Sequence, residues 1–128
     1  MKKVHAFFIL GLMLAGCRVK DKVLPLDVWS QDCVELAPYE NGYRLSGMCC
    51  SHLTLPQLNV NKKGIFITDA VYSSFTGAGF ADTTLRVTGH MSEADSVLTI
   101  AYALDTLSIQ KFRLKPGPRK KVCECFCD

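Results

Sequence analysis

The sequence lacks a strong charge of either sign once its first 16 residues are set apart. Residues 17–128 contain 13 Lys and Arg residues against 12 Asp and Glu residues, so the net charge of +3 for the whole chain falls to +1. This near balance excludes a strongly basic nucleic-acid-binding protein on global charge and an acidic, intrinsically disordered chain. We therefore expect a folded domain with no nucleic-acid partner.

The sequence also lacks a second long apolar run after the one at residues 4–14. No later stretch approaches the ~18 apolar residues that a membrane-spanning helix needs. No window of 11 or more residues after residue 33 shows the helical period of 3.6. The 112 residues that follow the first 16 are enough for one domain and too few for two.

The motifs of common catalytic sites are missing as well. The chain has no Gly-x-Ser-x-Gly elbow of a hydrolase, and Gly77-Ala78-Gly79 lacks the Lys and Ser or Thr of a phosphate loop. His90, Ser92 and Asp95 lie so close along the chain that a catalytic triad is not expected from them. We therefore expect a non-enzymatic protein without a cofactor, and a hydrolase is only a distant alternative.

The first 16 residues have the order of a secretory signal. Lys2-Lys3 precedes the apolar run at 4–14, and Ala15-Gly16-Cys17 follows it. Cations, an apolar core and small residues in this order are typical of a signal for export. An ordinary secretory signal and an uncleaved amphiphilic tail are the alternatives.

The stretch Leu14-Ala15-Gly16-Cys17 resembles the lipobox of bacterial lipoproteins. The resemblance covers residues 1–17 and implies cleavage before Cys17, a diacylglyceryl thioether on its sulfur and an acylated amino terminus. Two or three acyl chains anchor a protein stably, whereas one binds a membrane marginally. Arg18, in place of an aspartate, implies the outer membrane of a Gram-negative bacterium by the same resemblance. We expect a signal peptide at 1–16, a lipidated tether at 17–28 and a single β domain at 29–128.

Short apolar stretches separated by turn residues predict an all-β domain. Asn41-Gly42 is the strongest turn signal, because both residues tolerate positive φ in a two-residue type I′ hairpin. The pattern indicates about eight short antiparallel strands, and it predicts a meander that forms a small barrel or a sandwich. The expected strands cover residues 33–40, 43–50, 53–60, 65–72, 85–87, 98–104, 107–114 and 122–127.

The region from Gly64 to Leu114 resembles the calycin or lipocalin-like domains of secreted bacterial proteins, and it implies the barrel form of this fold. Trp29, before the first expected strand, departs from the lipocalin pattern because it lacks a Gly-x-Trp setting. This departure leaves the function open. The resemblance is carried by Phe66, Gly79-Phe80, Gly89, Ser92 and the Leu98-Thr99-Ile100 strand.

Six cysteines remain after Cys17 is assigned to lipid, and an even number indicates disulfides in an oxidising compartment. In a hairpin closed by Asn41-Gly42, Cys33 faces Cys50 at a non-hydrogen-bonded position, where Cα atoms are about 4.5 Å apart. We therefore predict a Cys33–Cys50 bridge. A bulge at Pro38 would shift the register and bring Cys49 opposite Cys33 instead.

Three further cysteines, Cys123, Cys125 and Cys127, alternate near the C-terminus. On a strand they share one face but bridge one another poorly, because their Cβ vectors run parallel. We expect them to fasten the C-terminus to the first hairpin, with Cys49 bonded to one of them. In the alternative, all three form bridges to Cys33, Cys49 and Cys50, which leaves six connectivities open.

A thiolate metal site is the competing interpretation of these cysteines. Closely spaced thiolates suit Cu(I) or Zn(II), although the Cys-x-x-Cys knuckles of zinc fingers are missing. The alternative function is accordingly a metal-binding envelope lipoprotein. Its ligands would come from Cys123, Cys125, Cys127, Cys49 and His52, with Cys50 as a further donor.

A basic segment at residues 111–121 contains six cations and no acid. We expect a solvated strand edge and loop, whose charge also discourages edge-to-edge aggregation. The alternative is a surface that faces anionic head groups, where each cation contributes up to ~1 kcal/mol. The six cations are Lys111, Arg113, Lys115, Arg119, Lys120 and Lys121.

These features together predict a lipid-anchored envelope β domain with a binding or structural role, stabilised by disulfides. The lipid makes the membrane its first partner. A small apolar ligand inside a barrel, an envelope polymer and another protein remain open as the second.

Overall fold

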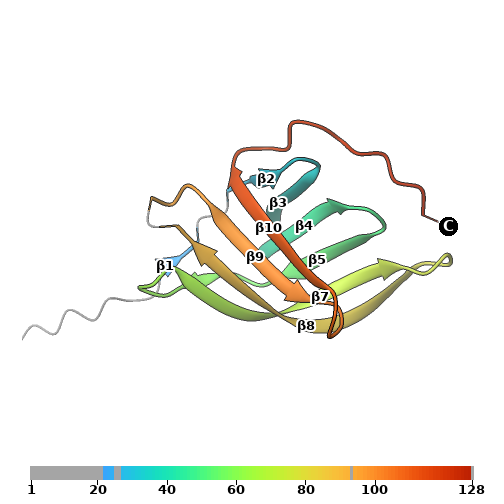
Figure 1. The fold of residues 1–128 in the computed structure, drawn as a ribbon, viewed down its shortest axis with the longest axis horizontal. Helices are drawn as coiled ribbons and strands as arrows, with labels where there is room; N and C mark the ends of the chain where they lie inside the picture. The colour runs from blue at the N-terminus through green and yellow to red at the C-terminus, as the bar shows by residue number, and fades with distance from the viewer. Residues whose placement is uncertain (1–21, 25–26, 93, 128) are drawn as a thin grey trace, which may run out of the picture.

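The computed structural model describes residues 22–24, 27–92 and 94–127, and their regular elements are all β-strands. Eight strands form a closed antiparallel barrel in the order β10-β2-β3-β4-β5-β7-β8-β9 (Figure 1). The prediction of about eight antiparallel strands is confirmed, and the closure identifies the barrel rather than the sandwich. The predicted signal peptide and Cys17 lie outside the described residues.

The barrel strands are short in the first half of the chain and longer in the second. Two further strands, β1 (Lys22–Val23) and β6 (Asn59–Val60), pair with each other outside the barrel. The described residues contain no helix that is long and apolar enough to cross a membrane. The barrel consists of β2 (Trp29–Gln31), β3 (Val34–Tyr39), β4 (Gly42–Met48), β5 (Ser51–Leu55), β7 (Ile65–Phe75), β8 (Phe80–Met91), β9 (Leu98–Ala103) and β10 (Ile109–Pro116).

Several predicted boundaries differ from the structure, and the strand predicted at 85–87 is much longer, spanning Phe80–Met91. The strand predicted at 53–60 ends at Leu55, because Pro56 has no N–H to donate to a ladder. The segment 122–127 forms no strand. At the other end, Trp29 begins a barrel strand, and buried Leu24 belongs to the fold although we expected it in the tether. The Leu24 amide donates to the Leu58 carbonyl over 2.8 Å, so this part of the predicted tether is held against the barrel.

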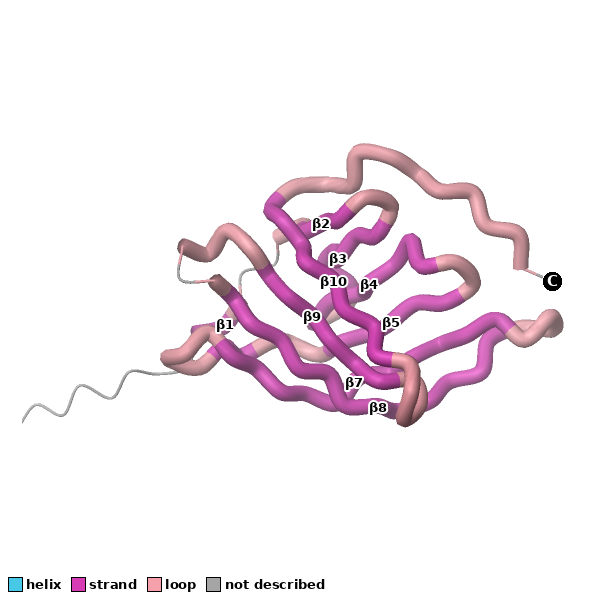
Figure 2. The backbone as a smooth tube through the Cα atoms, in the orientation of Figure 1, coloured by secondary structure: helices cyan, strands magenta, loops and turns pink. Residues whose placement is uncertain are grey.

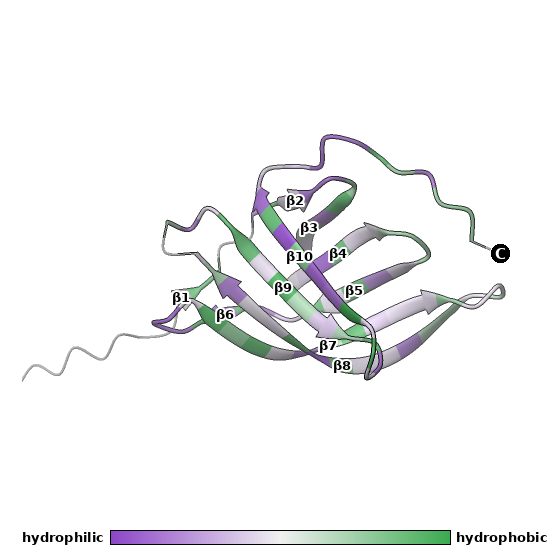
Figure 3. Cartoon of the chain, in the orientation of Figure 1, coloured by the Kyte–Doolittle hydropathy of each residue, from purple (hydrophilic) through white to green (hydrophobic). Residues whose placement is uncertain are grey.

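Alternating apolar side chains fill the barrel. Leu45 on β4 faces Leu36 on β3 and Leu53 on β5, and all three are fully buried. Such burial contributes roughly 25 cal/mol per Å² of apolar surface. The intervening residues face outward, and Figure 3 shows hydrophilic residues recurring along β10. The opposite wall contributes Val87, Met91, Leu98, Ile100 and Leu114.

The first hairpin turns one residue earlier than predicted. Glu40 and Asn41 form the two-residue turn, Glu40 has a φ of 52°, and Tyr39 pairs with Gly42. Gly42 therefore lies in β4, and a Cβ on it would overlap the carbonyl oxygen of Leu55 and the backbone of Pro56. Gly42 is small because the backbone after β5 passes close to it. The Asn41-Gly42 pattern does not distinguish this close approach from a glycine that is needed for a positive φ in the turn.

A Gly42→Ala substitution is expected to lower the free energy of unfolding by about 1–3 kcal/mol, the usual cost of overpacking. The added methyl group meets main-chain atoms of Leu55 and Pro56, which cannot rotate away as a side chain can. Urea unfolding measures the loss. Ser46→Ala on the same strand is the control, and an equally stable Gly42→Ala protein would contradict the close approach.

Candidate functional site

The segment 117–127, which we call the C-terminal strap, leaves β10 and runs back along the outside of the barrel (Figure 2). Three disulfides fasten it to the first half of the chain, with Cα–Cα distances of 5.6, 5.3 and 5.5 Å. The attachment points are two turns: Asp32-Cys33 joins β2 to β3, and Cys49-Cys50 joins β4 to β5. The bridges are Cys33–Cys123, Cys49–Cys125 and Cys50–Cys127.

The predicted Cys33–Cys50 bridge is therefore wrong. It depended on a register that placed Leu36 opposite Gly47, whereas Leu36 pairs with Leu45. In the observed register Cys33 and Cys50 belong to different turns, and Gly47 lies against the backbone of Cys33. The strap supplies the partners instead. The observed pairing is one of the six connectivities of the alternative in which all three C-terminal cysteines bond to Cys33, Cys49 and Cys50.

The same bridges bear on the alternative metal site. A disulfide sulfur is not a thiolate and offers none of the charge that binds Cu(I) or Zn(II). All six cysteines after Cys17 are bonded in this way. Within 22–24, 27–92 and 94–127, no group of three or more His, Cys, Asp or Glu side chains is placed to hold a metal ion.

His52 belongs to a polar cluster on the outer face of the barrel that sequence reasoning missed. Strand pairing places His52 opposite Ser73, and Ser73 opposite Asp82. The Ser73 hydroxyl donates to the Asp82 carboxylate over 2.7 Å, and the His52 ring contacts Phe80 with centroids 5.1 Å apart. Burial, followed by the nearby Arg44 guanidinium, lowers the pKa of His52. Because the carboxylate holds the serine directly, the cluster lacks the serine–histidine–acid order of a triad.

Ser92 shapes the loop between β8 and β9. Its hydroxyl oxygen accepts the backbone N–H groups of Ser96 and Val97, over 3.1 and 3.0 Å. The Ser96 hydroxyl lies 3.3 Å from the same oxygen. These contacts show that Ser92, which lies near His90 and Asp95 in the sequence, stabilises the loop.

Aromatic side chains occupy part of the barrel interior. The Tyr102 ring lies 6.0 Å from that of Tyr72 and 6.2 Å from that of Phe112. The Tyr102 hydroxyl donates to the Met48 sulfur over 3.0 Å, and burial raises the pKa of Tyr102. A small apolar ligand inside the barrel stays a prediction, and it would have to share the interior with these rings.

A basic cleft of about 1010 Å³ lies between the C-terminal strap and the barrel. Ser30 and Gln31 of β2 and two cations of β10 line one side, and strap residues 118–121 line the other. Five of the six cations of the predicted basic segment line it, and Asp32 is the one acid among the lining residues; Lys111 lies outside it. The five are Arg113, Lys115, Arg119, Lys120 and Lys121.

Backbone contacts fix both sides of the basic cleft. The Gln31 side-chain oxygen accepts the Arg113 N–H over 2.7 Å, at the point where β2 ends. On the strap, the Gly117 N–H donates to the Val28 carbonyl over 2.9 Å. The Arg119 N–H donates to the Glu35 carboxylate over 3.0 Å. The polypeptide is thus held while the charged ends of the side chains stay in solvent.

The cations of the cleft are not consumed by ion pairs within the described part of the chain. The only salt bridge found there joins Arg86 and Asp69, on the outer face of β7 and β8. Arg113, Lys115, Lys120 and Lys121 are exposed, and Arg119 is half-buried. The prediction of a solvated strand edge therefore describes most of these residues individually but misses that the strap turns them into a cleft.

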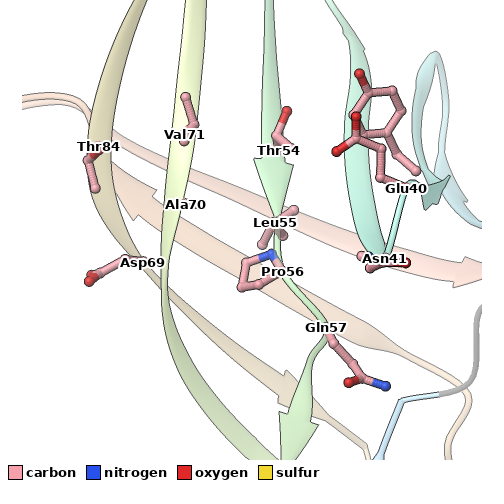
Figure 4. Close-up of a pocket in the computed structure, with 12 residues that line it drawn as sticks. Glu40, Asn41, Thr54, Leu55, Pro56, Gln57, Asp69, Ala70, Val71 and Thr84 are labelled. Atoms are coloured by element: carbon pink, nitrogen blue, oxygen red, sulfur yellow. The ribbon is translucent and has the colours of Figure 1, made fainter.

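A second groove, of about 540 Å³, opens beside the end of β5 (Figure 4). It arises because β5 pairs with β7 only as far as Thr54, opposite Val71, which leaves residues 65–70 of β7 without a partner on β5. Its charged lining residues are the acids Glu40 and Asp69, and it has no cation. The basic cleft is the stronger candidate for a binding site, because five cations outnumber its one acid and come from two sides.

Comparison with known proteins gives no relative to guide this choice. No family model, no curated protein and no solved structure matches the chain. The resemblance of residues 64–114 to calycin domains stays a prediction. The site is therefore interpreted from its own chemistry.

Proposed function

We propose that the chain is a lipid-anchored lipoprotein of the cell envelope whose disulfide-stabilised barrel has a binding role. The lipobox at Leu14-Ala15-Gly16-Cys17 supports the anchor. Its address is the outer membrane of a Gram-negative bacterium, on the resemblance that Arg18 carries. The barrel acts without catalysis, as a rigid body that carries a binding surface near the membrane.

The observation that carries this proposal is the pairing of the cysteines. The chain has seven cysteines, and three disulfides use six of them. Disulfides persist in the oxidising space outside the cytoplasm and are rare within it. Cys17 is the cysteine left over, and it stands at the position where a lipoprotein attaches its lipid. The count thus supports export and anchoring together.

Cys17→Ala is expected to abolish lipid attachment completely, because the thioether forms on this sulfur. The measurement is metabolic labelling with an alkyne-bearing palmitate analogue in a Gram-negative host, followed by fractionation of the envelope. Cys127→Ser is the matched control, since it also removes one cysteine but leaves the lipobox intact, and it should keep the label. Labelled Cys17→Ala protein would contradict the anchor.

A further inference from the structure

We infer that the basic cleft binds a ligand carrying several phosphate groups, and that the disulfide-held strap forms one side of that site. This inference rests on the proposed binding role. It does not rest on the lipid anchor, because every residue that it uses lies in the barrel or the strap.

The charge of the cleft selects the class of ligand. Five cations and a single acid, Asp32, line about 1010 Å³. Guanidinium groups such as those of Arg113 and Arg119 bind phosphate oxygens in bidentate fashion, and lysine ammonium groups bind them as point charges. One phosphate satisfies two or three such groups. Five cations spread over two sides of a cleft of this size therefore fit phosphates in series better than a single anion.

The cleft exists only while the strap is in place. Arg119, Lys120 and Lys121 precede Cys123 by two to four residues, and Cys123 is bonded to Cys33 in the turn after β2. The other side belongs to the barrel, because Arg113 and Lys115 are part of β10. Without the Cys33–Cys123 bridge, the strap cations lose the disulfide nearest to them and stay joined to the barrel through β10 and the two remaining bridges. Binding should then fall although the barrel cations are unchanged.

The first test uses the Cys17→Ala protein, which lacks the lipid, with its three bridges formed. Isothermal titration calorimetry at low salt measures binding of inorganic tripolyphosphate, with inorganic phosphate as the single-phosphate comparison. Arg113→Glu is expected to weaken tripolyphosphate binding about tenfold or more, as expected for loss of a charged hydrogen bond and introduction of repulsion. Lys111→Glu makes the same charge change on the same strand outside the cleft, and it should weaken binding less than about twofold, through screened long-range repulsion.

Two sources can supply phosphates in series at this site, and vesicles separate them. Phosphatidylcholine vesicles that contain phosphatidic acid present many phosphates on a lipid surface, whereas tripolyphosphate is free in solution. Binding to tripolyphosphate alone assigns a soluble ligand. Vesicle binding that is tighter per phosphate than tripolyphosphate binding, with the same sensitivity to Arg113→Glu, assigns a lipid headgroup. Either result supports the cleft. Equal losses for Arg113→Glu and Lys111→Glu would overturn it, because the whole face and not the cleft would then be responsible.

The strap is tested with the pair Cys33→Ser and Cys123→Ser, which removes only the bridge nearest the cleft. Tripolyphosphate binding is expected to weaken at least about fivefold, with the other two bridges verified by intact mass and the barrel by circular dichroism. Unchanged binding would overturn the role of the strap. No binding of either probe by the oxidised protein, or phosphate bound as tightly as tripolyphosphate, would overturn the ligand class. Lipid labelling is measured separately, so a failed anchor and a failed cleft remain distinguishable.

Discussion

Removal of all three disulfides is expected to lower the free energy of unfolding by at least about 4–5 kcal/mol, the value for a single closed loop of this length. The bridges join residues 90, 76 and 77 positions apart, so each closes most of the domain into a loop. A domain of this size has about 5–15 kcal/mol of stability in total. Urea unfolding of the oxidised and the fully reduced, alkylated protein measures the difference.

The contributions of Cys49–Cys125 and Cys50–Cys127 should not add, because these two bridges close nearly the same loop. With Cys49–Cys125 in place, Cys50–Cys127 restricts the unfolded chain little further. The Cys50→Ser and Cys127→Ser pair is therefore expected to cost about 1 kcal/mol or less, against at least about 4–5 kcal/mol for all three. A loss for this one pair as large as that for all three would contradict the redundancy. Equal stability of oxidised and reduced protein would contradict the bridges themselves.

Leu45→Ala is expected to lower the free energy of unfolding by about 2–5 kcal/mol, the range for a buried leucine that leaves a cavity. Leu45 is fully buried and lies between Leu36 and Leu53, which belong to the strands on either side. The neighbouring strands are hydrogen-bonded into the closed barrel, so their backbones have little freedom to fill the space. Urea unfolding of the oxidised protein measures the loss.

Ile67→Ala is the matched control for the Leu45 substitution. Ile67 is also an aliphatic residue within a barrel strand, but it faces outward and is 62% exposed. We expect a change within about 0.5 kcal/mol, as for most exposed substitutions. Equal losses for the two variants would show that Leu45 does not lie in the core.

The sequence allows much of the barrel to be predicted, because every second side chain of a strand faces the core and is apolar. Leu98, Ile100 and Tyr102 alternate cleanly and all face the core in β9. Turns with their own hydrogen bonds also fall where the sequence breaks between expected strands. The Asn61 side-chain oxygen accepts the N–H groups of Lys63 and Ile65 and holds the turn between the strands predicted at 53–60 and 65–72. Both signals are local, so one sequence contains them.

The sequence did not allow us to predict features that depend on contacts between segments far apart in the chain. Asn41-Gly42 predicts a turn, but Gly42 is small because β5 passes beside it, and this neighbour fixes the register. The predicted Cys33–Cys50 bridge was derived from the predicted register of this hairpin, so both predictions were wrong together. The cleft was hidden for the same reason, since residues 111–121 show their charge in sequence but not that the strap folds back over β2. The polar cluster of His52, Ser73 and Asp82 spans three strands and leaves no spacing signal.

The disulfide pattern also sets an order in time. Every bridge joins one of Cys33, Cys49 and Cys50 to one of the last three cysteines, at positions 123, 125 and 127. Under the export that we propose, a chain that is translocated from its N-terminus presents the first three thiols long before their partners arrive. Bonds formed early among those three are all non-native and must be exchanged later. Maturation of this barrel therefore waits for its final residues and depends on disulfide isomerisation rather than on oxidation alone.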